Sequence, residues 1–321
     1  VALPPKEGER ESAYALRLRR QATDHCRFVL PAATLTNVGV TMNARAMEHA
    51  ITKLLSSELV EEQQIGEELK ARGREITPTL IKYAERSQYL VETREAQRAE
   101  AEVLREFVPS VANATAEVTL VHFDPEAEAK VAAAFLTRYS GAPYSAAWEY
   151  VKGLSRSEVE RLLGEALSRL GPFDAPIREL EYADYTFEMI MDYGAYREFK
   201  RHRMQSYLAQ PLTVDLGYVV PDLVSEAGLE DRFNEAMEEA AEGYRQIKAL
   251  SPAVAQYLVT HAHKVRVLTK MNARECYHVF KLRTSPQAHF TIRRVLQKAM
   301  ELVSAKHPAL FRHIGLVLRK G

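Results

Sequence analysis

The chain has 321 residues, of which 46% are hydrophobic and 27% charged, the composition of an ordinary globular protein. This length predicts about two domains, and the composition excludes a collagen-like, disordered or disulfide-scaffold protein. Because 43 lysines and arginines balance 43 aspartates and glutamates, no overall field favours nucleic acid or a membrane surface, and any anion site must be local.

Helical and strand patterns both occur along the chain. Apolar spacing predicts helices at residues 9–25, 43–72, 84–105, 126–139, 159–170, 193–208, 229–248, 254–283 and 287–304, with a further helix beginning near Pro78. Period-two alternation predicts strands at residues 117–123 and 177–191. Ser155-Arg-Ser-Glu158 matches a capping box at the start of one helix. These elements predict an α+β fold.

Cysteine usage and the first residues bear on location. Cys26 and Cys276 are too few for a disulfide framework and fit a reducing compartment. No apolar run reaches the roughly 18 residues of a membrane-spanning helix. The chain opens with Val1 and has no basic and then apolar leader, so we expect a processed or partial chain in which a missing leader says nothing about secretion. A cytoplasmic location is the default expectation.

An internal repeat organises the sequence. Residues 27–49 align with residues 256–278 at an offset of 229, and both stretches contain Met-Asn-Ala-Arg followed, after three residues, by His. Further on, Thr77–Tyr83 corresponds to His307–His313 with one residue of slippage. Two ordered matches at nearly constant separation indicate a tandem duplication.

The repeat also predicts the domain boundaries. With this offset, residues 117–229 have no counterpart in the first copy, so their equivalent either lies upstream or was lost. We therefore expect an incomplete first unit over residues 1–95 and a complete second unit over residues 117–321. Residues 96–116 are expected to form a connecting helix or linker.

The densest functional signal is the cationic stretch Arg197-Glu-Phe-Lys-Arg-His-Arg203. Arg197 and Arg201 are four residues apart, so they share one face of the predicted helix, with Arg203 off that face. Guanidinium groups beside an imidazole form a good cradle for phosphate oxygens. The alternative is a basic stripe on the surface whose charge is compensated by Glu198 and neighbouring acidic residues.

Other patterns are weaker. His261 and His263 point apart at an i, i+2 spacing on a predicted helix, and no Cys or carboxylate lies at ligand spacing, so no metal site is expected. Neither Gly-x-Gly-x-x-Gly nor a Walker sequence is present, which disfavours a Rossmann or P-loop site. Cys276 and Ser206 lack an evident base, so no protein nucleophile is predicted.

The order of these motifs resembles the flavin-dependent thymidylate synthases, the ThyX family. A Gly-Pro-Phe turn within Leu170–Asp174 precedes the alternating strand, and a helix with Arg201-His-Arg203 follows. Asn272-Ala-Arg274, with Arg283 nine residues later, begins the helical C-terminal part. The resemblance covers residues 117–321. It implies the family's α+β fold, with an antiparallel sheet and a strongly helical C-terminal part.

The first copy resembles the C-terminal half of the family unit, which the second copy resembles as a whole. The similarity lies in residues 9–95, most closely in Arg27-Phe-Val-Leu-Pro31 and Asn43-Ala-Arg45. The resemblance therefore implies a duplicated fold with an incomplete first copy. Because such a tandem pair mimics a dimer, we expect a homodimer that mimics the family's tetramer.

The resemblance also implies ligands and site residues. The family converts dUMP to dTMP by reductive methylation: methylenetetrahydrofolate supplies the carbon, reduced FAD the hydride, and NADPH restores the flavin. The residues matching the FAD site are Arg201, His202, Arg203, Asn272, Arg274 and His278. Those matching the nucleotide-phosphate site are Arg27, Arg283 and Ser206.

Several positions depart from the family pattern. After Arg-His-Arg, the places of an Asn, a Glu, a Ser and an Arg are taken by Leu208, Ala209, Pro211 and Thr213. Leu54 stands where Arg283 stands in the second copy, and Gln256 stands where Arg27 stands in the first. One mixed pocket drawing on both copies is therefore a hypothesis. The functions that follow are a flavin-dependent thymidylate synthase or, alternatively, a non-catalytic paralogue that binds FAD or nucleotide or acts as a scaffold.

Overall fold

The computed structural model describes residues 3–107 and 116–318. The chain divides into two compact units. The first contains Val1–Leu30, Thr115–Ala240 and Val259–Gly321, and the second contains Pro31–Ala114 and Ala241–Leu258. Each unit thus combines segments from both predicted copies.

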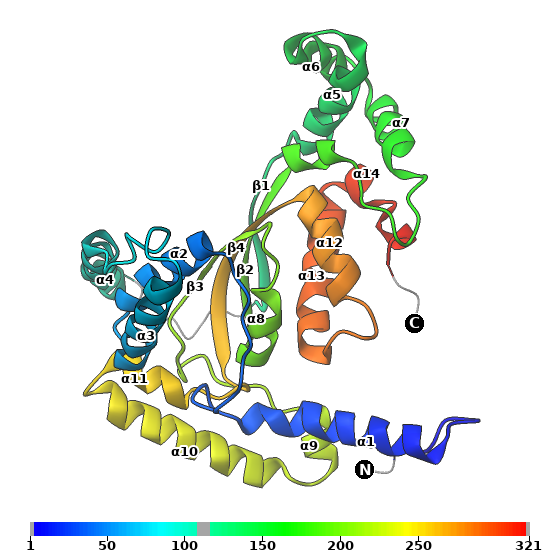
Figure 1. The fold of residues 1–321 in the computed structure, drawn as a ribbon. Coiled ribbons are helices and arrows are strands. Elements are labelled where there is room, and N and C mark those ends of the chain that lie inside the picture. The colour runs from blue at the N-terminus through cyan, green and yellow to red at the C-terminus, as the bar shows by residue number, and fades with distance from the viewer. Residues whose placement is uncertain (1–2, 108–115, 319–321) are drawn as a thin grey trace. The chain divides into compact units, whose positions relative to one another are not determined.

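The first unit is built on a four-stranded antiparallel sheet (Figure 1). Its strands are β1 (Val118–Phe123), β2 (Asp184–Asp192), β3 (Ser206–Ala209) and β4 (Lys264–Asn272), in the order β1-β2-β4-β3. β2 pairs with β4 along its whole length, from Asp184 opposite Asn272 to Asp192 opposite Lys264. The buried side chains alternate along β2 because one face of the strand meets the core.

Some helices of the first unit pack on this sheet, and others pack mainly on one another. Their bounds are Glu11–Cys26 for α1, Ala127–Ser140 for α5, Tyr144–Lys152 for α6, Arg156–Leu167 for α7, Tyr193–Phe199 for α8, Asp222–Glu226 for α9, Ala273–Arg283 for α12, Phe290–Lys306 for α13 and Pro308–Phe311 for α14. Helix α13 packs against α12, β1 and β2, and Figure 1 shows α12 and α13 side by side next to the sheet. The main core lies between these helices and the strands, with Tyr185, Phe187 and Phe280 fully buried.

The second unit is helical in the part that the structure describes. It contains α2 (Ala44–Leu55), α3 (Val60–Ile76), α4 (Gln88–Phe107), α11 (Pro252–Ala255) and the 3₁₀ turn Gln256–Leu258. Helix α10 (Glu230–Lys248) begins in the first unit and continues into the second. A small core joins α2 to the turns after α3 through Ile51, Leu55, Ile81 and Ala84.

The two repeat segments have similar local backbones. Asn43 (φ −76°, ψ 164°) caps α2, and Asn272 (φ −78°, ψ 166°) caps α12. In both, the side-chain oxygen accepts a hydrogen bond from the backbone N–H three residues on. At the far end, Thr77 (φ −137°, ψ 65°) follows α3 and His307 (φ −130°, ψ 71°) follows α13. This agreement supports the duplication, which remains a prediction together with its boundaries.

The predicted α+β class with an antiparallel sheet is confirmed, and so is the capping box of Ser155 and Glu158 at α7. The strand predicted over residues 177–191 is β2 from Asp184 onward, preceded by the 3₁₀ turn Arg178–Tyr182. The helix predicted over residues 254–283 is wrong, because β4 occupies its middle. The helix predicted over residues 193–208 ends at Phe199 instead, and β3 follows it.

Three further expectations concern the first copy and the linker. The helix predicted over residues 43–72 is two helices, α2 and α3, with a break between Leu55 and Val60. At Pro78, within the described residues, the chain makes turns instead of the predicted helix. The predicted connecting segment 96–116 is helical as far as Phe107, while residues 108–115 lie outside the described residues.

Candidate functional site

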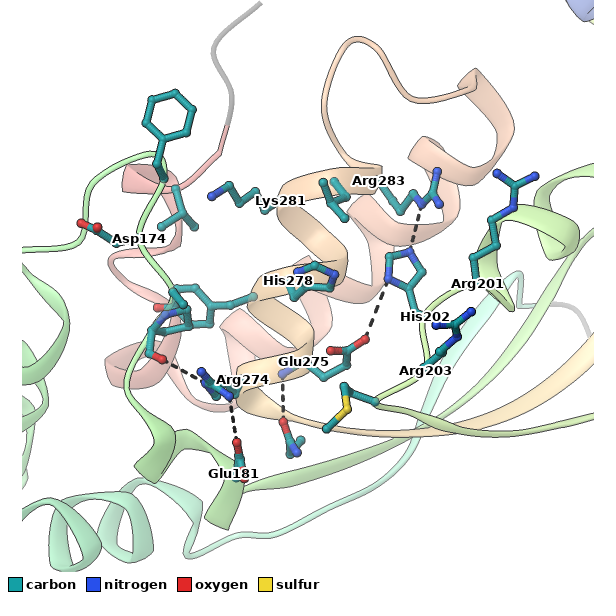
Figure 2. A pocket seen from close by; sticks show the side chains of 18 residues that line it. Asp174, Glu181, Arg201, His202, Arg203, Arg274, Glu275, His278, Lys281 and Arg283 are labelled. Atoms are coloured by element: carbon teal, nitrogen blue, oxygen red, sulfur yellow. Dashed lines mark hydrogen bonds and ion pairs between the residues drawn. The ribbon is translucent and has the colours of Figure 1, made fainter. Parts of the chain in front are cut away.

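A cavity of about 620 Å³ lies in the first unit, beside α12 (Figure 2). One wall is α12 itself. The others are the turn at residues 173–176, Glu181, and residues 201–204, which follow α8. All six of the predicted FAD residues line this cavity, so the structure brings the whole predicted set together.

Helix α12 presents one of its faces to this cavity. Arg274, His278 and Lys281 are spaced so that they lie on the same side of a helix. The start of the helix is fixed by Asn272, whose Oδ1 accepts a hydrogen bond of 2.8 Å from the backbone N–H of Glu275. This cap uses only the carbonyl oxygen of Asn272, which leaves its amide N–H groups as donors.

Arg274 anchors the opposite wall. Its Nε donates to the carbonyl oxygen of Pro176 at 3.0 Å, and its Nη1 donates to Glu181 Oε1 at 3.0 Å. Figure 2 shows Arg274 turned toward Glu181. The charge of Arg274 is therefore already compensated, and its main effect is to hold the wall against α12.

The cationic triplet lies in a turn rather than on a helix. Because α8 ends at Phe199, Arg197 and Arg201 do not share a helix face as predicted. Arg197 instead lies outside the cavity, with Nη1 2.7 Å from Nε2 of His261. Arg201 and Arg203 are exposed and line the cavity, whereas His202 between them is buried.

The cavity carries excess positive charge. Arg201, Arg203 and Lys281 all line it, and none of their side chains has a hydrogen-bond or ion-pair partner among residues 3–107 and 116–318. These three cations outnumber Asp174, a carboxylate that lines the same cavity and accepts from the backbone N–H of Gly171, so the lining favours an anionic ligand.

Two buried titratable groups lie behind these cations, and the first is His202. Arg283 Nε donates to His202 Nε2 at 3.0 Å. Since an arginine can only donate, the neutral His202 carries its proton on Nδ1. Burial and then the charge of Arg283 lower the pKa of His202 to about 4. His202 Nδ1 faces Glu275 Oε1 at 3.9 Å, which is too long for a hydrogen bond.

Glu275 is the second buried group. Its side chain is 6% exposed, and no described residue forms a hydrogen bond with its Oε1. Burial raises the pKa of Glu275 to about 7, because the low-polarity surroundings disfavour the ionised form. At neutral pH the cavity thus contains a carboxyl group that gains or loses a proton readily.

The predicted phosphate residues are only partly brought together. Arg283 Nη1 donates to Glu198 Oε2 at 2.9 Å, and Arg27 Nη2 lies 3.8 Å from Glu198 Oε1. Both arginines line a second cavity of about 670 Å³. Ser206, in contrast, is exposed on β3 and lines neither cavity.

Two residues of the cavity, Glu275 and Lys281, are not identified by the sequence motifs. Helical spacing from the motif residues could have identified them. Lys281 lies seven residues after Arg274, and Glu275 lies three residues before His278, so on a helix each lies near a motif residue. Cys276 is fully buried, and burial raises the pKa of its thiol.

Metal-ligand clusters and membrane-spanning helices are both missing from the described part of the chain. Within residues 3–107 and 116–318, no three His, Cys, Asp or Glu side chains gather in a group able to hold a metal ion. None of the helices that the structure describes has the length and apolar character needed to span a bilayer.

Comparison with known families decides the affiliation. The sequence model of the family described as "Thymidylate synthase complementing protein" matches residues 8–79 and 119–309. The chain belongs to this family. Its membership confirms the resemblance drawn from the Arg-His-Arg and Asn-Ala-Arg motifs.

Curated relatives fall into two groups. A "UPF0159 protein" of Chlamydia muridarum is 34% identical over 95% of this chain and 59% of its own length. One from Thermoplasma acidophilum is 30% identical over 94% of this chain and 60% of its own length. The flavin-dependent thymidylate synthase of Geobacter sulfurreducens is 29% identical over 62% of this chain and 87% of its own length. The chain thus spans about 60% of the length of the UPF0159 relatives.

Solved structures show a looser similarity. Thymidylate synthase X from Helicobacter pylori, crystallised with FAD and dUMP, gives a TM-score of 0.47 at 21% identity and covers 62% of this chain and 98% of its own. The UMP/dUMP methylase PolB from Streptomyces cacaoi gives a TM-score of 0.48 at 18% identity, over 62% of this chain and 93% of its own.

Proposed function

We propose that this chain is a flavin-binding member of the ThyX family and that its FAD site is the cavity beside α12. The observation that carries the proposal is the convergence of Arg201, Arg203 and Lys281, without partners among the described residues, on one cavity. A pyrophosphate is the part of FAD that needs such charge, and guanidinium forks match its oxygens.

The residues of the cavity suit a flavin in other respects. The volume of about 620 Å³ lies within the range of cofactor sites. The free amide N–H groups of Asn272 and the ring of His278 supply polar contacts on the α12 side. His278 packs edge-on against His202, with ring centroids 5.6 Å apart. Arg274 keeps the wall in place through Glu181 rather than binding the cofactor's charge.

The reaction we propose is that of the family, reductive methylation of dUMP to dTMP with methylenetetrahydrofolate and NADPH. When bound, the flavin supplies the hydride chemistry. The chain itself supplies charge and orientation from Arg201 and Arg203. Glu275, with its raised pKa, holds a proton within the cavity, and the neutral His202 presents Nδ1–H toward it. No step requires a protein nucleophile.

A nucleotide-phosphate site is proposed at Arg27 and Arg283, which the two predicted copies contribute separately. Both arginines lie against Glu198. Their repeat counterparts are Gln256 and Leu54, neither of which carries charge. We therefore propose one such site per chain rather than two.

The rival function is a non-catalytic FAD- or nucleotide-binding module. One observation favours it: Leu208 and Ala209 lie exposed on β3, where the family pattern has an Asn and a Glu, and neither side chain can hydrogen-bond a base.

We also propose that the chain forms a homodimer and that it is located in the cytoplasm. The mass of the purified chain by light scattering tests the first of these.

The absorption spectrum of the purified chain discriminates between the functions. A flavin band, or one gained on adding FAD, together with NADPH oxidation that depends on dUMP, supports the enzyme. Flavin binding without dUMP-dependent turnover supports the binding module. If the chain neither carries nor takes up FAD, the proposal is overturned and a scaffold role is the remaining alternative.

A further inference from the structure

Glu198, in the last turn of α8, lies between the two arginines proposed for nucleotide phosphate. Its Oε2 accepts from Arg283 Nη1 at 2.9 Å, its Oε1 lies 3.8 Å from Arg27 Nη2, and its backbone carbonyl accepts from Arg283 Nη2 at 3.2 Å. Each carboxylate oxygen therefore faces a different guanidinium. A phosphate monoester would use the same two arginines in the same bridging manner.

We infer that Glu198 is an internal carboxylate that occupies the anion position between Arg27 and Arg283, so that a phosphate monoester binds there only by displacing it. The inference rests on the proposed function only for the kind of ligand that displaces the carboxylate. Glu198 lines the second cavity but not the proposed FAD cavity beside α12.

The charge balance explains why this matters for selectivity. With Glu198 in place, the two guanidinium charges of Arg27 and Arg283 are balanced by Glu198 and by Asp24, whose Oδ1 lies 3.6 Å from Arg27 Nη1. Without the charge of Glu198, this group carries one net positive charge, which attracts a phosphate anion more strongly. The carboxylate of Glu198 is therefore expected to weaken the binding of a phosphate monoester at this position without preventing it.

Displacement of the carboxylate is physically accessible. The side chain of Glu198 is 22% exposed, and those of Arg283 and Arg27 are 19% and 33% exposed. Ion pairs at such partly exposed positions are weak and screened by salt. The cavity of about 670 Å³ next to them gives an incoming ligand room.

Arg283 does not depend on the carboxylate alone for its position. Its Nε is held by His202, and its Nη2 is held by the backbone carbonyl of Glu198. Glu198→Gln removes the negative charge and keeps the shape of the side chain and both of these contacts. The substitution is therefore expected to preserve the fold while freeing charge on the two arginines.

The test is calorimetric titration of the full chain with inorganic phosphate, dUMP and deoxyuridine. We expect Glu198→Gln to bind phosphate and dUMP at least tenfold more tightly than the natural chain, with no gain for deoxyuridine. Glu188→Gln is the matched control, because Glu188 pairs with Arg266 on β4 and lines neither cavity; it should leave phosphate affinity unchanged. Adding Arg27→Ala to Glu198→Gln should abolish the gain.

Unchanged or weaker phosphate binding by Glu198→Gln would overturn the inference, and so would a gain that survives Arg27→Ala. If thermal melts show that Glu198→Gln is unfolded, Glu198→Ala carries the same expectation and the same refutation. Flavin absorption is recorded in parallel. If Glu198→Gln gains phosphate affinity but the chain takes up no FAD, this inference stands and the proposed function is rejected. If the chain takes up FAD but Glu198→Gln gains no phosphate affinity, the proposed function stands and this inference is rejected.

Discussion

Arg283 Nε donates a hydrogen bond of 3.0 Å to His202 Nε2, and this contact lies between the cavity beside α12 and the cavity at Glu198. Arg283 lines both cavities, whereas His202 lines only the one beside α12. Burial and then the charge of Arg283 keep His202 neutral, and because arginine can only donate, the contact fixes the proton of His202 on Nδ1, facing Glu275. The chemistry of the site therefore depends on a contact between a residue of α12 and a residue of the turn after α8.

The raised pKa of Glu275 predicts a specific pH dependence of stability. Its pKa is about 7 in the folded chain and 4.5 in a free side chain. Between these values the folded state holds a proton that the unfolded state releases, so this group lowers the free energy of unfolding as pH rises toward 7. His202, with its pKa lowered from 6.5 to about 4, acts in the opposite direction between those two values.

Glu275→Gln isolates the contribution of Glu275. Relative to the natural chain, we expect the variant to gain about 2–3 kcal/mol in the free energy of unfolding as the pH rises from about 5 to about 8. Urea unfolding at the two pH values measures it. Parallel pH profiles for the two proteins would show that the carboxyl of Glu275 ionises normally.

Removal of Arg201 and Arg203 should affect ligand binding rather than folding. Both side chains are exposed and unpaired among the described residues, so each Ala substitution should change stability by less than about 0.5 kcal/mol. Each should weaken FAD binding roughly tenfold or more, because a charge-assisted contact is lost. Fluorescence titration with FAD gives the affinity. Lys270→Ala is the control, since Lys270 pairs with Asp184 and lines neither cavity.

The two capping asparagines provide a matched pair. Asn272→Ala and Asn43→Ala should each cost about 1 kcal/mol, because each removes the acceptor at a helix N-terminus. Asn272→Ser should regain most of the stability but not the FAD affinity, since a hydroxyl caps the helix without supplying the amide N–H groups. Thermal melts and FAD titration separate the two effects. If Asn272→Ser binds FAD as tightly as the natural chain, the amide has no part in the proposed site.

Phe28 should be a large contributor to stability. It is 1% exposed and packs with Val224, Phe233, Met237 and Ala262. Phe28→Ala should cost about 3–5 kcal/mol through lost burial and the cavity left behind. Val29→Ala, at a position that is 39% exposed, is the comparison and should cost far less. Urea unfolding measures both losses, and similar values for the two variants would contradict the packing described.

The elements predicted correctly from the sequence are those whose signals are local. The capping box of Ser155 and the alternation of β2 are examples, because neighbouring residues determine both. The prediction failed at β4, where Val265, Val267 and Met271 are buried in a strand that pairs with two others far away in the chain. Such pairing is set by tertiary contacts, which override a local helical pattern.

The site was predicted to a similar extent. The motif residues of α12 and of the turn after α8 line one cavity, as the family resemblance implied. The neighbourhood of Arg27 and Arg283 was foreseen only as a mixed pocket, and the carboxylate of Glu198 that bridges the arginines was not. Which acidic residue forms an ion pair with which arginine depends on the packing of separate elements, and the spacing of residues along the sequence does not determine it.

The assignment of residues 1–30 to the first unit has a practical consequence for anyone wishing to dissect the gene. A fragment beginning at residue 117 would contain the whole sheet and α12, yet it would lack both the buried ring of Phe28 and the guanidinium of Arg27. The two predicted copies are in this sense mutually dependent, and separate expression of the second would yield a destabilised product with an unfinished anion pocket.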